Sequence, residues 1–137
     1  MAIDYSIDVE RGLVRATALG ELNLPDSLLH VRQVFADARF RPGMDALFDL
    51  SLSSAREYTV AELRRLVGAL ERQSWALRSG ARWAIVAGCD LDFGMSRVFE
   101  GLSAHLPIEI AVFRCREEAQ AWIDSRAGAG SADSEGP

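Results

Sequence analysis

The chain has 137 residues, of which 49% are apolar and 26% are charged, and its formal net charge is −5. This length suits one domain that needs no disulfide or metal to fold, and the composition excludes a disordered main body. The basic residues are scattered along an acidic chain, which argues against nucleic acid as a main ligand. All 15 basic residues are arginine, so no lysine is available for a Schiff base, a phosphate loop or a general base.

The termini and cysteines favour a cytoplasmic protein. Met1–Tyr5 lacks a basic region followed by an apolar stretch, so no secretory signal is predicted. Apolar runs such as Trp83–Gly88 are too short to span a membrane. Cys89 and Cys115 lack the Cys-x-x-Cys spacing, and we expect free thiols. The alternative is a redox pair, which requires Cα atoms about 4.4–6.8 Å apart.

The first elements in chain order are a hairpin and a helix. Ile3, Tyr5 and Ile7 alternate with polar residues, and after Arg11-Gly12 a second alternating run, Leu13–Leu19, predicts an antiparallel partner strand. Asn23 and Asp26, with a proline between them, begin a helix that ends near Asp37. Its expected apolar face is formed by Leu24, Leu28, Val31 and Phe35.

The middle of the chain predicts a buried strand and a long helix. The strand is Met44–Leu50, which follows an Arg-Pro-Gly turn. Thr59–Glu62 is a capping box, because the threonine oxygen and the glutamate carboxylate can each accept the other residue's amide. The helix behind it extends to Ser79-Gly80, with apolar residues at Leu63, Leu66, Val67, Leu70 and Leu77.

The last third predicts two further strand–helix units. Trp83–Ala87 is a buried strand, and Asp90 or Asp92 caps a helix that is stopped by Pro107. Ile108–Val112 is the last strand. A final helix follows, with Glu117 and Glu118 in its first turn. Residues 1–126 therefore form a single domain, and 127–137 read as a disordered tail rich in Gly, Ala, Ser and acids.

This order predicts an α/β fold with an N-terminal hairpin, then βα repeats, and a mostly parallel five-stranded sheet with four helices. If the strands lie in chain order, the crossover helices share one face of the sheet. Trp83 alternates away from Ala84 and Val86. It could therefore face the side without helices, where an exposed tryptophan would mark an interface.

Several segments resemble bacterial SpoIIAA-like proteins, a STAS-type family. They cover nearly the whole chain except the tail, and they are mainly structural: Gly12–Leu22, Arg39–Leu50, Trp83–Val86, Phe93–Glu100 and Val112–Ile123. The resemblance implies a fold shared by anti-sigma-factor antagonists, sulfate-transporter domains and, distantly, CRAL-TRIO lipid-transfer domains. It implies no enzymatic activity.

In the antagonists, a strand ending in Asp-Leu-Ser leads to an Asp-Ser-Ser-Gly-Leu segment whose serine is phosphorylated to switch off partner binding. Asp49-Leu50-Ser51 matches the strand end, whereas Glu57-Tyr58-Thr59-Val60 at the helix start lacks the glycine. The loop Ser51–Thr59 follows the carboxyl end of a parallel strand, where open α/β sheets place their ligands. Its candidate interface and phospho-switch residues are Asp49, Ser51, Ser53, Ser54, Glu57, Tyr58 and Thr59. The alternative is purely structural, with Thr59 as a helix cap.

No catalytic motif, cofactor site or metal site is predicted. The sequence contains no Gly-rich phosphate loop, nucleophile elbow or paired-carboxylate signature. His30 and His105 lack neighbours at metal-ligand spacing, and each is interpreted as a surface helix residue without a role. The leading hypothesis is a non-enzymatic regulatory domain that binds an unidentified protein partner, with a homodimer as one form. The alternative is a small-molecule or lipid-binding module of CRAL-TRIO type, which needs an apolar cleft of roughly 300 Å³ or more.

Overall fold

The computed structural model describes residues 3–135, with side chains described from residue 3 to residue 125. The strands are β1 (Ile3–Asp8), β2 (Leu13–Glu21), β3 (Asp45–Ser54), β4 (Arg82–Val86) and β5 (Glu109–Phe113). The helices are α1 (Leu24–Ala36), α2 (Val60–Glu71), the 3-10 turn η1 (Ser74–Ala76), α3 (Asp90–Leu102) and α4 (Arg116–Glu135). The disordered tail expected from Ala127 lies outside the residues whose side chains are described, and it stays a prediction.

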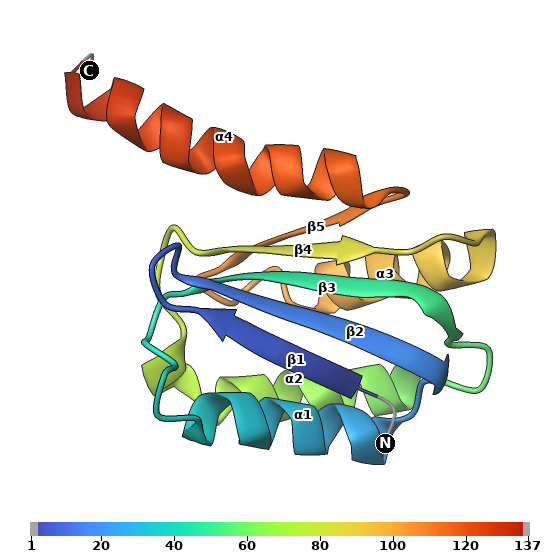
Figure 1. Ribbon diagram of the computed structural model, residues 1–137. Coiled ribbons are helices and arrows are strands. Elements are labelled where there is room, and N and C mark those ends of the chain that lie inside the picture. Colours follow the sequence, from blue (N-terminus) through green and yellow to red (C-terminus); the bar gives the residue numbers. More distant parts are fainter. Residues whose placement is uncertain (1–2, 136–137) are drawn as a thin grey trace.

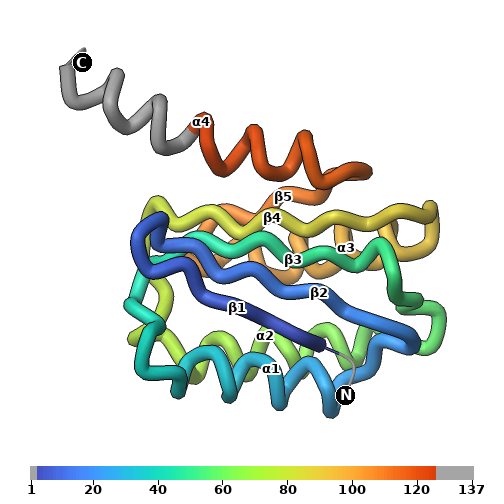
Figure 2. The backbone as a smooth tube through the Cα atoms, in the orientation of Figure 1, coloured from blue at the N-terminus to red at the C-terminus, as the bar shows by residue number. Residues whose placement is uncertain are grey.

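The five strands form one sheet in the order β1-β2-β3-β4-β5. β1 and β2 are antiparallel, and every later pair is parallel. The chain thus crosses the sheet once from one edge to the other, as Figure 2 shows. The predicted hairpin, strand number and mostly parallel sheet are confirmed.

The helices α1, α2 and α3 cover one face of the sheet, and α4 lies on the other (Figure 1). Right-handed crossovers between parallel strands in chain order require the shared face of the first three. The main core lies beneath them, where alternate strand residues such as Ala16, Leu50 and Ile85 pack against Leu24 and Leu63. α4 follows the last strand and is free to pack on the opposite face.

A smaller core under α4 buries the residues that alternate with the first set. Leu13, Leu47 and Val86 pack there against Ala119 and Ile123. The face opposite the crossover helices is therefore partly covered.

Trp83 faces the crossover helices. It packs against the cluster of Leu70, Leu77, Ala81 and Ile108. The expectation that it faces the other side is wrong, because the residues that fill the α4 face are its small or branched neighbours Ala84 and Val86.

Three predicted boundaries also need correction. β3 extends through Ser54, because Leu52, Ser53 and Ser54 pair with the long end of β2. α2 ends at Glu71 and the chain continues through a 3-10 turn, so Leu77 reaches the core from outside the helix. Neither Asp90 nor Asp92 caps α3: the N-cap is Cys89, without a side-chain bond.

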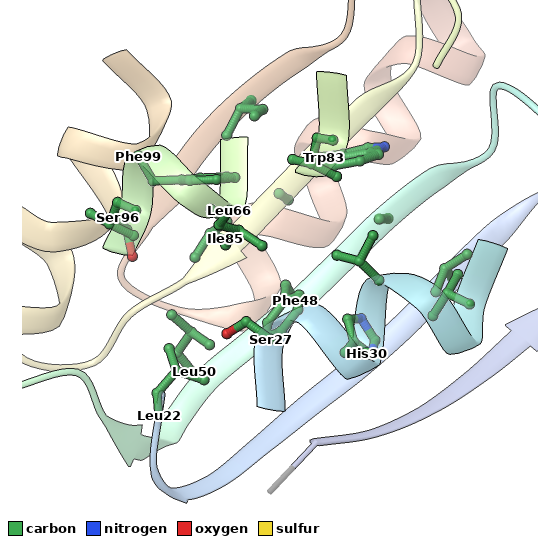
Figure 3. Close-up of a pocket in the computed structure, with 18 of the residues that line it drawn as sticks. Leu22, Ser27, His30, Phe48, Leu50, Leu66, Trp83, Ile85, Ser96 and Phe99 are labelled. Carbon is green, nitrogen blue, oxygen red and sulfur yellow. The ribbon is translucent and has the colours of Figure 1, made fainter. Parts of the chain in front are cut away.

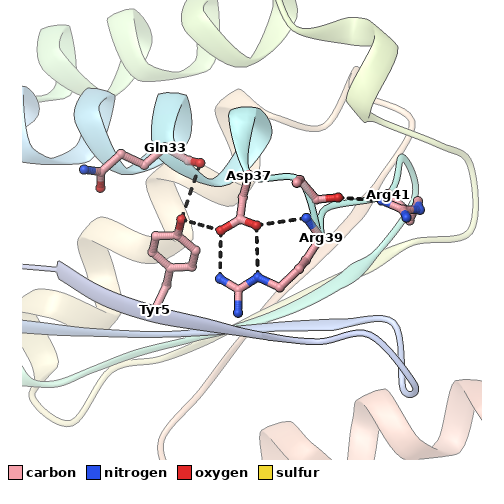
Figure 4. A network of polar contacts seen from close by, with 6 residues as sticks. Tyr5, Gln33, Asp37, Arg39 and Arg41 are labelled. Carbon is pink, nitrogen blue, oxygen red and sulfur yellow. Dashed lines mark hydrogen bonds and ion pairs between the residues drawn. The ribbon is translucent and has the colours of Figure 1, made fainter.

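A polar cluster ties the end of α1 to the edge strand β1 (Figure 4). The Tyr5 hydroxyl donates to Asp37 Oδ2 at 2.8 Å, and Arg39 donates to Asp37 Oδ1 through Nε at 3.0 Å and to Oδ2 through Nη2 at 2.8 Å. The hydrogen bonds from Arg39 and Tyr5 hold the pKa of Asp37 well below its usual range. Burial and the Asp37 carboxylate raise the pKa of Tyr5.

Candidate binding sites

The predicted interface segment lies at the carboxyl edge of the sheet, but most of its side chains are engaged within the fold. Asp49 is buried and accepts the Ser51 amide at 2.9 Å. Its other oxygen lies 3.7 Å from Arg116 Nε at the start of α4. Asp49 therefore connects β3 to α4 and offers little to a partner.

The three serines belong to the extended end of β3, and not to a loop as expected. The Ser53 hydroxyl donates to the Leu50 carbonyl at 3.0 Å, and Ser54 Oγ accepts the Arg56 amide at 3.4 Å. Ser51 is exposed. The register of β2 and β3 shifts by one residue between the pairs Thr17–Asp49 and Leu19–Leu52.

The loop consists of residues 55–59 only, and hydrogen bonds hold its two ends in place. The Ala55 amide donates to the buried Asp92 carboxylate at 2.9 Å. Thr59 caps α2 with the predicted capping box: Glu62 N donates to Thr59 Oγ1 at 3.1 Å, and Thr59 N donates to Glu62 Oε1 at 2.9 Å. Glu57 is exposed, whereas Tyr58 points into the core.

Exposed aliphatic side chains are concentrated at this same edge. Of the large apolar residues that are exposed among those described, four lie where β2 and β3 end or where α2 and α3 begin: Leu19 at 43%, Leu52 at 65%, Val60 at 42% and Leu91 at 51% exposure. Leu19 and Leu52 are register partners on adjacent strands, so their side chains are neighbours. Periodicity did not reveal these residues, because strand and helix ends lie outside the repeating pattern.

Cys89 and Cys115 are free thiols near the same edge, the first exposed and the second partly buried. Each follows the end of one of the neighbouring strands β4 and β5. Because both thiols are free, the structure contains no disulfide between Cys89 and Cys115.

An apolar cavity of about 150 Å³ lies between the crossover helices and the sheet (Figure 3). Residues from α1, α2, α3 and the middle of the sheet line it, among them Phe48, Leu50, Leu66, Ile85 and Phe99. None of its lining residues is an acid or an arginine. The polar side chains in the lining are Ser27, His30, Tyr58, Ser96 and the indole of Trp83.

His30 is buried at 9% exposure, so its interpretation as a surface residue is wrong. Its ring makes edge contacts with Tyr5 and Phe48, at centroid distances of 5.7 and 5.2 Å. Burial lowers its pKa from 6.5 to about 4, so the imidazole is neutral at pH 7. The buried face of α1 is Leu24, Ser27, His30 and Val34, which includes two polar residues that an apolar count passes over.

Two buried polar atoms in the cavity lining lack a hydrogen bond of normal geometry within the described chain. They are His30 Nδ1 and the Tyr58 hydroxyl oxygen. The Tyr58 hydroxyl lies near Ser27, whose own hydroxyl donates to the Asn23 carbonyl at 2.8 Å. Burial raises the pKa of Tyr58, so this hydroxyl is protonated at neutral pH.

Within the described residues, no cluster of His, Cys, Asp or Glu could hold a metal ion. His105 is exposed and pairs with Glu71. Among residues 3–135, no helix has the length and apolar character needed to cross a membrane.

Comparison with solved structures identifies the fold. The chain superposes on an uncharacterised protein of the DUF3478 family from Shewanella loihica PV-4, described as having a SpoIIAA-like fold, with a TM-score of 0.57. The match covers 89% of this chain and 94% of the other, at 17% sequence identity. This chain has a SpoIIAA-like fold. No protein-family model matches the sequence, and a search of curated proteins finds no match either.

The SpoIIAA-like architecture agrees with the resemblance seen in the sequence. At 17% identity the likeness concerns the fold alone. Any function of this SpoIIAA-like domain has to be argued from its own sites.

Proposed function

We propose that this SpoIIAA-like chain is a non-enzymatic, cytoplasmic STAS-type regulatory domain that binds another protein at the carboxyl edge of its sheet. The observation that supports it is the group of exposed aliphatic side chains Leu19, Leu52, Val60 and Leu91 at that edge. Exposed apolar surface costs free energy in water, and burying it drives most protein association.

The edge also has the rigidity that an interface needs. The Ala55 amide is fixed by Asp92, and Thr59 is fixed by its capping box. Leu52 lies on a strand end that is paired with β2. An interface whose backbone is held in place loses little conformational entropy on binding.

A phosphorylation switch has less support than the interface itself. A phosphoryl group on Thr59 would lie against the Glu62 carboxylate and would break the cap, which is unfavourable on both counts. Ser53 and Ser54 are engaged with the backbone. Ser51 is the exposed serine of the segment and the residue on which a phosphate should first be sought.

The interface is tested by charge substitutions at the edge. Affinity capture from lysate of the source cells is compared for the wild type, Leu52→Asp and the control Val98→Asp. Val98 is an exposed aliphatic residue on α3, at 37% exposure against 65% for Leu52. Each substitution at an exposed site should change the free energy of unfolding by about 0.5 kcal/mol or less. We expect a partner that Leu52→Asp loses and Val98→Asp retains.

Sedimentation of the wild type and of Leu52→Asp tests the homodimer: if the edge forms a homodimer, the wild type should sediment as a dimer and Leu52→Asp as a monomer. Capture of no protein together with a monomeric wild type would contradict the proposal. Capture that is equal for all three proteins would contradict the placement of the interface at this edge.

One observation favours the CRAL-TRIO alternative, namely the cavity beneath the helices. The small volume of this cavity, however, limits the size of the ligand that it can hold. At about 150 Å³ the cavity is half of the roughly 300 Å³ at which sites for drug-sized ligands begin. A lipid therefore does not fit the cavity as it stands. Native mass spectrometry of the protein purified from its source should accordingly find no co-purifying lipid.

A further inference from the structure

We infer that the core cavity is a binding site for a small, neutral molecule with an apolar body of about the size of a benzene ring and one hydroxyl group. The inference does not depend on the carboxyl-edge interface, although Tyr58 of the edge loop also lines the cavity. The inference is based on the cavity's volume, the absence of charge in its lining and the two unsatisfied polar atoms.

Volume sets the size of the occupant. An apolar cavity of about 150 Å³ in another protein binds benzene and stays dry when empty. The cavity here has that volume, about 150 Å³, and its walls include Phe48, Leu50 and Ile85. A single ring or a compact aliphatic group fits, and a long acyl chain does not.

The lining sets the charge. No acid and no arginine lines the cavity, and His30 is neutral at pH 7 because burial lowers its pKa to about 4. An ionised ligand would lose its hydration without gaining a counter-ion, and this is strongly unfavourable. A carboxylate or an ammonium ion is therefore excluded, and the ligand is neutral.

The unsatisfied atoms set the polar group. His30 is 9% exposed and Tyr58 is 6% exposed, yet His30 Nδ1 and the Tyr58 hydroxyl lack hydrogen bonds of normal geometry within the described chain. Buried polar atoms are ordinarily paired, so two of them on one cavity point to a missing partner. A ligand hydroxyl both donates and accepts, so it complements either tautomer of the imidazole and the phenol of Tyr58.

The simplest probe is phenol, with benzene and benzoate as matched controls. Methyl-region NMR follows each titration, with Leu50 and Leu66 reporting from the cavity wall and Val9 in the hairpin turn as a remote control. Phenol should shift the Leu50 and Leu66 methyl signals and leave Val9 unchanged. It should bind about fivefold more tightly than benzene, the ratio expected for one net hydrogen bond. Benzoate should not bind.

Two variants separate the hydrogen bond from the cavity. His30→Phe keeps a ring but removes both ring nitrogens, Nδ1 among them, and Tyr58→Phe keeps a ring but removes the hydroxyl. The preference for phenol over benzene should therefore fall toward unity in at least one of them. Ala46→Leu adds bulk to a lining position and should weaken both ligands together. The wild-type comparison of phenol with benzene stands by itself if Ala46→Leu does not fold.

Three results would overturn the inference. They are the absence of phenol-dependent shifts at Leu50 and Leu66, equal affinities of the wild type for phenol and benzene, and a phenol preference that survives in both ring variants. Binding of benzoate as tight as that of phenol would contradict the argument from charge.

Discussion

Acid should destabilise this protein through His30 before its carboxylates matter. The imidazole is enclosed by Tyr5, Phe48 and the cavity wall, and burial lowers its pKa from 6.5 to about 4. In the unfolded chain the same ring takes up a proton near pH 6.5. Between these two values the unfolded state binds more protons than the folded state, so the free energy of unfolding falls as the pH falls.

The size of this effect follows from the difference between the two pKa values. At about 1.4 kcal/mol for each pH unit, the loss amounts to about 3 kcal/mol. The stability is fully present above pH 6.5, is lost progressively down to about pH 4, and has no further His30 contribution below that. A loss of that size is a large part of the 5–15 kcal/mol that is typical of a domain, roughly a fifth or more.

Urea unfolding at pH 7.0, 5.5 and 4.0, followed by tryptophan fluorescence and circular dichroism, measures the loss. The His30→Phe variant should lack it, so the difference in free energy of unfolding between variant and wild type should change by about 3 kcal/mol over this range. Carboxylates titrate in both proteins and cancel in the difference. His105→Gln replaces the chain's other histidine and leaves His30 in place, so it is the control variant for loss of a histidine elsewhere. Parallel curves for wild type and His30→Phe would refute the reasoning.

Two further predictions concern the anchors of the carboxyl-edge loop. Thr59→Ala should cost about 1 kcal/mol of stability through loss of the cap, while Thr59→Ser, which keeps the oxygen, should cost much less in the same urea assay. Asp92→Ala leaves the buried Ala55 amide unpaired and should lower the free energy of unfolding by about 1–3 kcal/mol. Hydrogen exchange of that amide should accelerate by about 5- to 150-fold, the factor that corresponds to this free energy. Unchanged exchange at Ala55 would show that the bond does not hold the loop.

Local sequence patterns predicted most of the framework, because they report short-range physics. The alternation at Ile3–Ile7 and Leu13–Leu19 predicts the hairpin, and the Thr59 capping box predicts the start of α2. Asn23 caps α1 as expected, accepting the Asp26 amide at 2.9 Å. Each of these depends on residues a few positions apart, so the sequence contains the information directly.

The sequence predictions were wrong where contacts with a segment far away in the chain determine the local structure. The Ser51–Ser54 segment reads as a loop because its polar residues show no strand pattern, and it becomes strand because β2 extends beside it. Asp92 reads as a helix cap, yet its carboxylate accepts an amide 37 residues away. Neither pairing leaves a local signal.

The sequence by itself determined the α/β architecture with a hairpin, four helices and a mostly parallel sheet, since element type depends on periodicity, caps and turns. Only the tertiary structure decided which face of each element is buried. His30 and Trp83 show this, because a residue's place on a helix or strand is local, whereas what covers it comes from other elements. The core cavity and its unsatisfied atoms arise in the same way, from side chains of three helices and several strands that meet only in the folded chain.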